Sequence, residues 1–74
     1  MRNTLSDRQR KMLAYIHEFS TERHYPPSLQ EIRAAVELKS ASTVKGHLDR
    51  LRKSGYVTWE EGKARTIRVI KEAM

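Results

Sequence analysis

A chain of 74 residues has room for one domain with one core, and its 15 Lys and Arg against 9 Asp and Glu favour a polyanionic partner, either nucleic acid or an acidic membrane surface. The lack of cysteine excludes a disulfide framework, a thiolate nucleophile and cysteine-ligated zinc. No stretch approaches the roughly 20 apolar residues that cross a bilayer and no signal segment opens the chain, so we expect one soluble, cytoplasmic domain over residues 1–74 without a membrane partner.

The first predicted element is a helix that begins after Ser6. Gln9 lies three residues further on, and this spacing matches a capping box. The apolar residues that follow at helical spacing are Met12, Ile16 and Phe19. We expect the helix to cover residues 7–21 and to be ended by the segment 25–27, because proline keeps the residue before it out of the helical conformation.

A second capping box, formed by Ser28 and Glu31, predicts a short helix over residues 29–36. A tight connection at residues 38–40 follows it. A third helix then begins with Ser40 or Ser42 as its N-cap. Its inward side chains are Val44, Leu48 and Leu51. We expect this helix to end near Ser54, where Gly55 supplies a left-handed residue.

After Tyr56 the apolar residues alternate with polar ones, which predicts a β-strand. A break at residues 61–64 separates it from a second such run at 66–70, so a hairpin closes the chain. The alternation places Trp59 in the core. Three helices followed by a hairpin predict a mainly α fold with a small β-hairpin, the winged helix-turn-helix.

The outward face of the third helix is the first candidate for nucleic-acid recognition. A rotation of about 100° per residue places on this face, or beside it, Ser42, Thr43, Lys45, Gly46, Asp49 and Lys53. Direct readout of bases is one interpretation, and a solvated face with ordinary Lys45–Asp49 and Asp49–Lys53 pairs is the other. Glycine destabilises a helix interior by about 1 kcal/mol relative to alanine. The presence of Gly46 is explained either by close approach of the helix to DNA or by random drift.

Other candidates for phosphate contact lie at helix starts, at the hairpin tip and, for Arg68, on the strand after it; solvated charge is the alternative interpretation. They are Arg8, Arg10, Lys11, Ser28, Gln30, Lys39, Lys63, Arg65 and Arg68. His47 lies near the edge of the inward stripe, where it is either a packed, hydrogen-bonded residue or a DNA contact. His17 and His24 lack a third ligand at metal spacing, so we expect neither a metal nor any other cofactor, and no small-molecule ligand.

Four segments resemble, in order and spacing, the amino-terminal domain of the LexA family of SOS repressors. They are Leu5-Ser6-Asp7-Arg8-Gln9, Tyr25-Pro26-Pro27-Ser28 with Glu31-Ile32, Ser42-Thr43-Val44-Lys45-Gly46-His47-Leu48, and Lys53-Ser54-Gly55-Tyr56-Val57. The resemblance covers nearly the whole chain, and the recognition segment is most similar to a branch distinct from the enterobacterial one. It implies a transcriptional repressor of the response to DNA damage, with the third helix in the major groove and the wing on the backbone.

The resemblance further implies double-stranded DNA with a palindromic operator as partner, and a homodimer on that DNA. We expect the DNA-binding residues to be Arg8, Ser28, Lys39, Ser40, Ser42, Thr43, Lys45, Gly46, His47, Lys63 and Arg65. LexA repressors continue into a dimerising, self-cleaving domain, whereas this sequence ends at Met74. We therefore expect no enzymatic activity, whether the sequence is an excised domain or a natural stand-alone protein.

Two alternatives remain open from the sequence. One is a winged-helix adaptor that contacts other proteins, although the positive third helix and wing favour DNA. The other is a stand-alone LexA-like regulator or antagonist that is not controlled by DNA damage.

Overall fold

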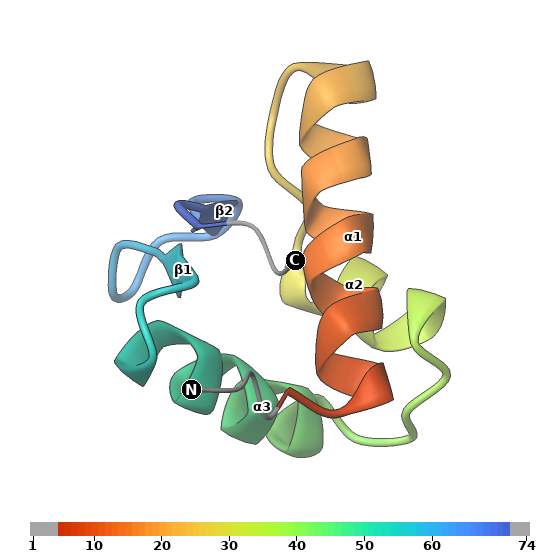
Figure 1. The fold of residues 1–74 in the computed structure, drawn as a ribbon. Coiled ribbons are helices and arrows are strands. Elements are labelled where there is room, and N and C mark those ends of the chain that lie inside the picture. Colours follow the sequence, from red (N-terminus) through yellow and green to blue (C-terminus); the bar gives the residue numbers. More distant parts are fainter. Residues whose placement is uncertain (1–4, 72–74) are drawn as a thin grey trace.

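The computed structural model describes residues 5–71. Its elements are α1 (Asp7–Arg23), α2 (Leu29–Ala35), α3 (Ala41–Lys53), β1 (Val57–Thr58) and β2 (Arg68–Val69). In Figure 1, α3 lies across the lower end of α1, and the antiparallel β1–β2 pair stands above the C-terminal part of α3. This arrangement is the winged helix-turn-helix that the sequence predicts. Within residues 5–71, no helix is long and apolar enough to span a bilayer.

The first helix begins at its predicted capping box. The Ser6 Oγ accepts from the Gln9 backbone N–H at 3.1 Å, and the Gln9 Oε1 accepts from the Ser6 N–H at 3.1 Å. The predicted end at residue 21 is two residues too early. The helix continues to Arg23 because His24, with φ 66°, ends it in the left-handed conformation and donates its N–H to the Ser20 carbonyl.

The second and third helices also begin at serine caps. Ser28 and Glu31 form the predicted capping box, and α2 ends one residue before its predicted end. For α3 the structure decides between the two candidate caps, because the Ser40 Oγ accepts from the Ser42 N–H at 3.1 Å. Gly55 has the expected left-handed backbone, with φ 87°.

One hydrophobic core joins all three helices to the wing. Its most buried side chains are Met12, Ile16, Ile32, Val44, Leu51 and Val57. The three inward positions predicted for the third helix are all buried. Burial of this side of α3 leaves its opposite side on the surface of the domain.

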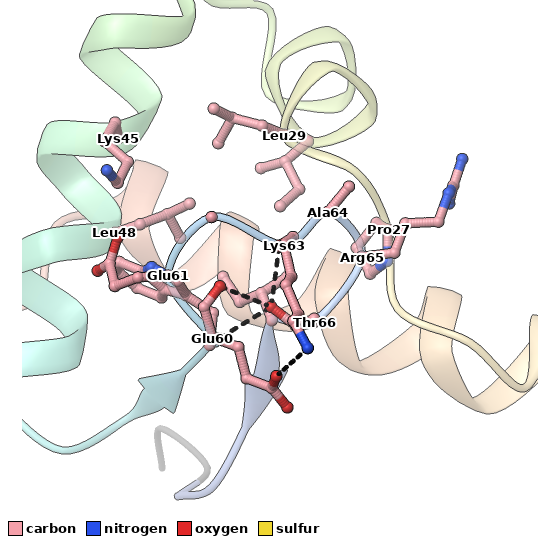
Figure 2. Close-up of a pocket in the computed structure, with 14 residues that line it drawn as sticks. Pro27, Leu29, Lys45, Leu48, Glu60, Glu61, Lys63, Ala64, Arg65 and Thr66 are labelled. Carbon is pink, nitrogen blue, oxygen red and sulfur yellow. Dashed lines mark hydrogen bonds and ion pairs between the residues drawn. The ribbon is translucent and has the colours of Figure 1, made fainter.

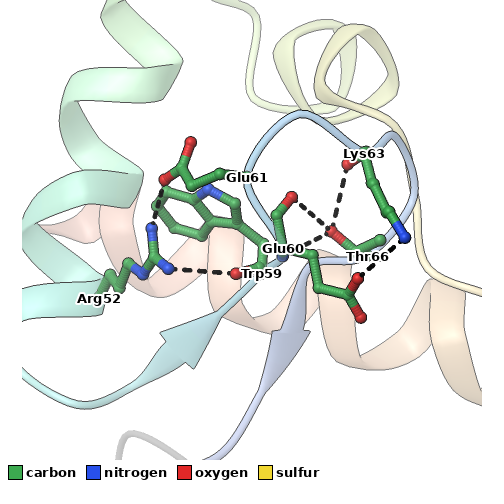
Figure 3. Close-up of polar contacts among 6 residues, drawn as sticks. All are labelled: Arg52, Trp59, Glu60, Glu61, Lys63 and Thr66. Carbon is green, nitrogen blue, oxygen red and sulfur yellow. Dashed lines mark hydrogen bonds and ion pairs between the residues drawn. The ribbon is translucent and has the colours of Figure 1, made fainter.

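The hairpin is shorter than predicted, since its ladder pairs only Val57 with Val69 and Thr58 with Arg68. The wing loop, residues 59–67, leaves the ladder because the Thr66 hydroxyl replaces strand pairing: it accepts from the Glu60 N–H at 2.9 Å (Figure 3). The prediction that Trp59 lies in the core is therefore wrong. Trp59 follows the last pair, is half-buried and packs against the core from outside.

Candidate nucleic-acid interface

The outward face of α3 is exposed as its periodicity predicts. Its exposed residues are Ser42, Thr43, Gly46, Asp49, Arg50 and Lys53. Apart from its chain neighbours and the backbone of its own helix, a Cβ at Gly46 would have no atom of residues 5–71 within 4 Å, so the surface is open at this position. Neither of the ion pairs of Asp49 that the sequence suggested, with Lys45 or with Lys53, is among the salt bridges of residues 5–71.

Two half-buried side chains flank this face on opposite sides. Lys45 lies on the wing side, where its Nζ is 5.9 Å from the centroid of the Trp59 ring. His47 lies on the α1 side, where its Nδ1 is 3.4 Å from the Gln9 Nε2. His47 is thus the packed, hydrogen-bonded histidine that the sequence offered as one interpretation, and its second ring nitrogen is not engaged in this contact.

The predicted phosphate contacts at helix starts already have roles within the fold. The Arg8 guanidinium donates to the Val36 carbonyl at 3.4 Å and so links the first turn of α1 to the end of α2. Ser28 and Ser40 cap helices through their side chains. Lys39 is exposed just before α3. The contacts of Arg8, Ser28 and Ser40 hold these residues at helix ends, where backbone N–H groups and cations attract phosphate.

A cavity of about 280 Å³ separates the wing loop from α2 and α3 (Figure 2). Leu29 and Leu48 line it from the two helices, and Lys45 stands at its α3 side. Because the loop does not fill this space, its position depends on contacts at its two sides.

Arg52 of α3 holds the first side of the wing loop (Figure 3). Its guanidinium lies 4.2 Å from the Trp59 ring centroid, donates to the Trp59 carbonyl at 3.1 Å and pairs with Glu61 at 2.7 Å. The hydrogen bond from Arg52 lowers the pKa of Glu61. The sequence does not indicate this role of Arg52, because spacing along α3 carries no information about a partner in the wing.

Arg65 holds the other side of the loop to the start of α2. Its guanidinium bonds both carboxylate oxygens of Glu31, at 2.9 and 3.1 Å, donates to the Pro26 carbonyl at 3.2 Å and lies over the Tyr25 ring. The hydrogen bond between the two side chains lowers the pKa of Glu31 and raises that of Arg65. Arg65, expected to contact phosphate, is thus occupied within the fold.

Lys63 of the wing loop stays accessible. Its Nζ lies 3.7 Å from the Glu60 carboxylate, and both side chains are about 70% exposed. Ion pairs of this length between exposed groups contribute little. Lys63 can therefore exchange Glu60 for a phosphate at low cost, whereas Arg65 cannot leave its partners so readily.

Comparison with known proteins identifies the family of the chain. Residues 2–66 match the family model of the LexA DNA binding domain. The chain belongs to this family. The LexA repressors of Shouchella clausii and Halalkalibacterium halodurans are each 50% identical over 66 residues, or 89% of the chain. That of Caldicellulosiruptor saccharolyticus is 40% identical over 72 residues, or 97% of it.

Membership of the LexA DNA-binding family confirms the resemblance predicted from the sequence, and with it the function: the domain binds double-stranded DNA with sequence specificity. The chain spans about a third of the length of these LexA repressors, between 32% and 36%. The matching family is one of DNA-binding domains.

Proposed function

We propose that the chain is the operator-binding part of a LexA-type transcriptional repressor of the DNA-damage response. The observation that carries this proposal is the exposed polar face of α3, which has open space at Gly46 and is flanked by the wing. An α-helix with such a face fits the major groove, and a flanking wing reaches the sugar-phosphate backbone. A cytoplasmic location belongs to the same proposal, because the DNA that a repressor controls lies there.

We assign base readout to the N-terminal half of α3, through Ser42, Thr43, Lys45 and His47. Gly46, which has no side chain, allows the helix backbone to approach the groove closely. Phosphate contacts fall to residues at the rim, namely Arg8, Ser28, Lys39, Ser40 and Lys63. Arg65 takes a different role from the one predicted, because its bonds to Glu31 leave it to position the wing. The operator is palindromic, and two copies bind it as a homodimer related by the operator's symmetry.

Selection of binding sites from random duplex DNA tests this proposal. A palindromic consensus is expected, and Lys45→Ala should lose about 1–3 kcal/mol at one base pair of each half-site and much less on random DNA. Lys63→Ala is the matched control, since loss of a phosphate contact weakens all duplexes to a similar extent. If no sequence were enriched, the proposal would fail and a protein-interaction adaptor would be favoured.

A further inference from the structure

Gln9 is the one buried polar side chain in the part of the chain that the structure describes, with 8% of its surface exposed. It lies in the first turn of α1 and joins two elements. Its Oε1 accepts the Ser6 backbone N–H, and its Nε2 lies 3.4 Å from Nδ1 of His47 on α3. The residue that completes the capping box of α1 thus contacts an edge of the proposed recognition surface on α3.

The capping box fixes which end of the Gln9 amide faces the histidine. A side-chain amide has one acceptor oxygen and one donor nitrogen. If the amide were rotated by 180°, its NH₂ group would face the Ser6 N–H. Both groups are donors, so the capping hydrogen bond would be lost. The backbone of Ser6 therefore keeps the Gln9 oxygen on its own side and the donor nitrogen on the side of His47.

This orientation determines the tautomer of the imidazole. Since the Gln9 nitrogen only donates, Nδ1 of His47 must accept through its lone pair, and the proton of the neutral ring then resides on Nε2. The two ring nitrogens point away from each other, so Nε2–H is directed away from Gln9. Within residues 5–71 this second nitrogen has no hydrogen-bond partner.

We propose that Gln9 is a positioning residue for DNA recognition, which locks His47 as the Nε2–H tautomer so that α3 offers one N–H donor to an acceptor on DNA. The proposal rests on the proposed function, because it requires the α3 face to meet DNA. The acceptors that fit are a base edge in the major groove, such as guanine O6 or N7, and a phosphate oxygen. A lysine could supply the same donor only with a charge, whereas the neutral imidazole supplies it without one.

Gln9→Glu separates this role from helix capping. Glutamate at the third helical position also completes a capping box, so α1 and the thermal stability of the domain should be preserved. The carboxylate, however, only accepts, so the single proton of the neutral ring moves from Nε2 to Nδ1 through exchange with water, and Nε2 is left without a donor. Two-bond ¹H–¹⁵N spectra distinguish the two neutral tautomers and should be recorded at about pH 8.5, well above the ordinary pKa of histidine. We expect the Nε2–H tautomer of His47 in the unmodified chain and the Nδ1–H tautomer in the variant.

DNA binding supplies the second readout. Gln9→Glu should lose about tenfold in affinity beyond the loss caused by Ala14→Glu, which adds a negative charge at an exposed position of the same helix; tenfold corresponds to one hydrogen bond. In a His47→Ala background the two charge variants should have equal effects, as a double-mutant cycle requires of a residue that acts through His47. A loss larger on the selected operator than on random duplexes places the acceptor on a base, and an equal loss places it on phosphate.

An Nδ1–H ring in the unmodified chain would overturn the proposal. So would a tautomer that does not change in Gln9→Glu, or an excess loss that persists without His47. If the unmodified chain bound no duplex, the proposed function would fail instead, and the spectra would still decide whether Gln9 sets the tautomer.

Discussion

Glu31 and Arg65 lie 34 residues apart in the sequence, and their side chains form a two-point ion pair with distances of 2.9 and 3.1 Å. The same Glu31 Oε1 also accepts the Ser28 backbone N–H at 2.8 Å. One carboxylate therefore caps α2 and holds the far side of the wing loop. The position of the wing loop relative to α2 depends on this side chain together with the contacts that Arg65 makes with Pro26 and Tyr25.

Arg65 and Lys63 should affect DNA binding in a non-additive way. Lys63→Ala removes a phosphate contact, whereas Arg65→Ala releases the loop that carries Lys63. We expect each variant to weaken binding, and the double variant to lose little more than Arg65→Ala alone. Titrations of one operator duplex with the three variants measure this. Independent losses that add up would instead show that Arg65 has its own contact with DNA.

The Glu31–Arg65 pair should make the stability of the domain depend on pH in the acid range. The pKa of Glu31 is lowered chiefly by its hydrogen bond with Arg65, so folding favours the charged carboxylate. This stabilisation is present above the ordinary glutamate pKa and is lost as the pH falls through the lowered value. We expect Glu31→Gln to melt lower than the unmodified chain at neutral pH and to converge with it below about pH 4. Glu18→Gln, on the exposed side of α1, is the control, and a pH-independent difference for Glu31→Gln would contradict the prediction.

Gly46→Ala should move stability and binding in opposite directions. Beyond its chain neighbours and the backbone of its own helix, the added methyl group meets no atom within 4 Å in the described structure. Alanine stabilises a helix interior by up to about 1 kcal/mol relative to glycine. The same methyl group stands on the face that we assign to the groove. A thermal melt should therefore rise while operator affinity falls. Full binding by a more stable variant would show that the groove does not press on α3 there.

Arg52→Ala should loosen the wing on its α3 side. The guanidinium covers the ring of Trp59 at 4.2 Å, a contact worth about 0.5–1 kcal/mol at an exposed site. Because Trp59 is the single tryptophan, its fluorescence reports this contact directly, and its emission should shift to longer wavelength as water reaches the ring. Arg52→Lys should recover the charge but only part of the emission, since lysine lacks the planar group that stacks. An unchanged spectrum in Arg52→Ala would argue against the stacked arrangement.

Features that depend on neighbouring residues could be predicted from the sequence alone. The capping boxes at Ser6 and Ser28 join residues three positions apart, and the buried stripe of α3 follows from its helical period. Local spacing determines both kinds of feature, whatever the rest of the fold does. The order of the elements then indicated the winged helix-turn-helix and its outward recognition face.

The second roles of the same residues were decided only by the tertiary structure. Gln9 reaches His47 across 38 residues, and Glu31 reaches Arg65 across 34. The position of Trp59 outside the core likewise depends on where the ladder ends and on the path of the wing loop. Periodicity indicates which side of an element is buried, but not the angle at which two elements cross or the path of a loop between them. For this reason the sequence predicts only that Arg65 lies at the tip of a wing. The tertiary structure shows that its guanidinium is bound to the carboxylate of Glu31 in α2.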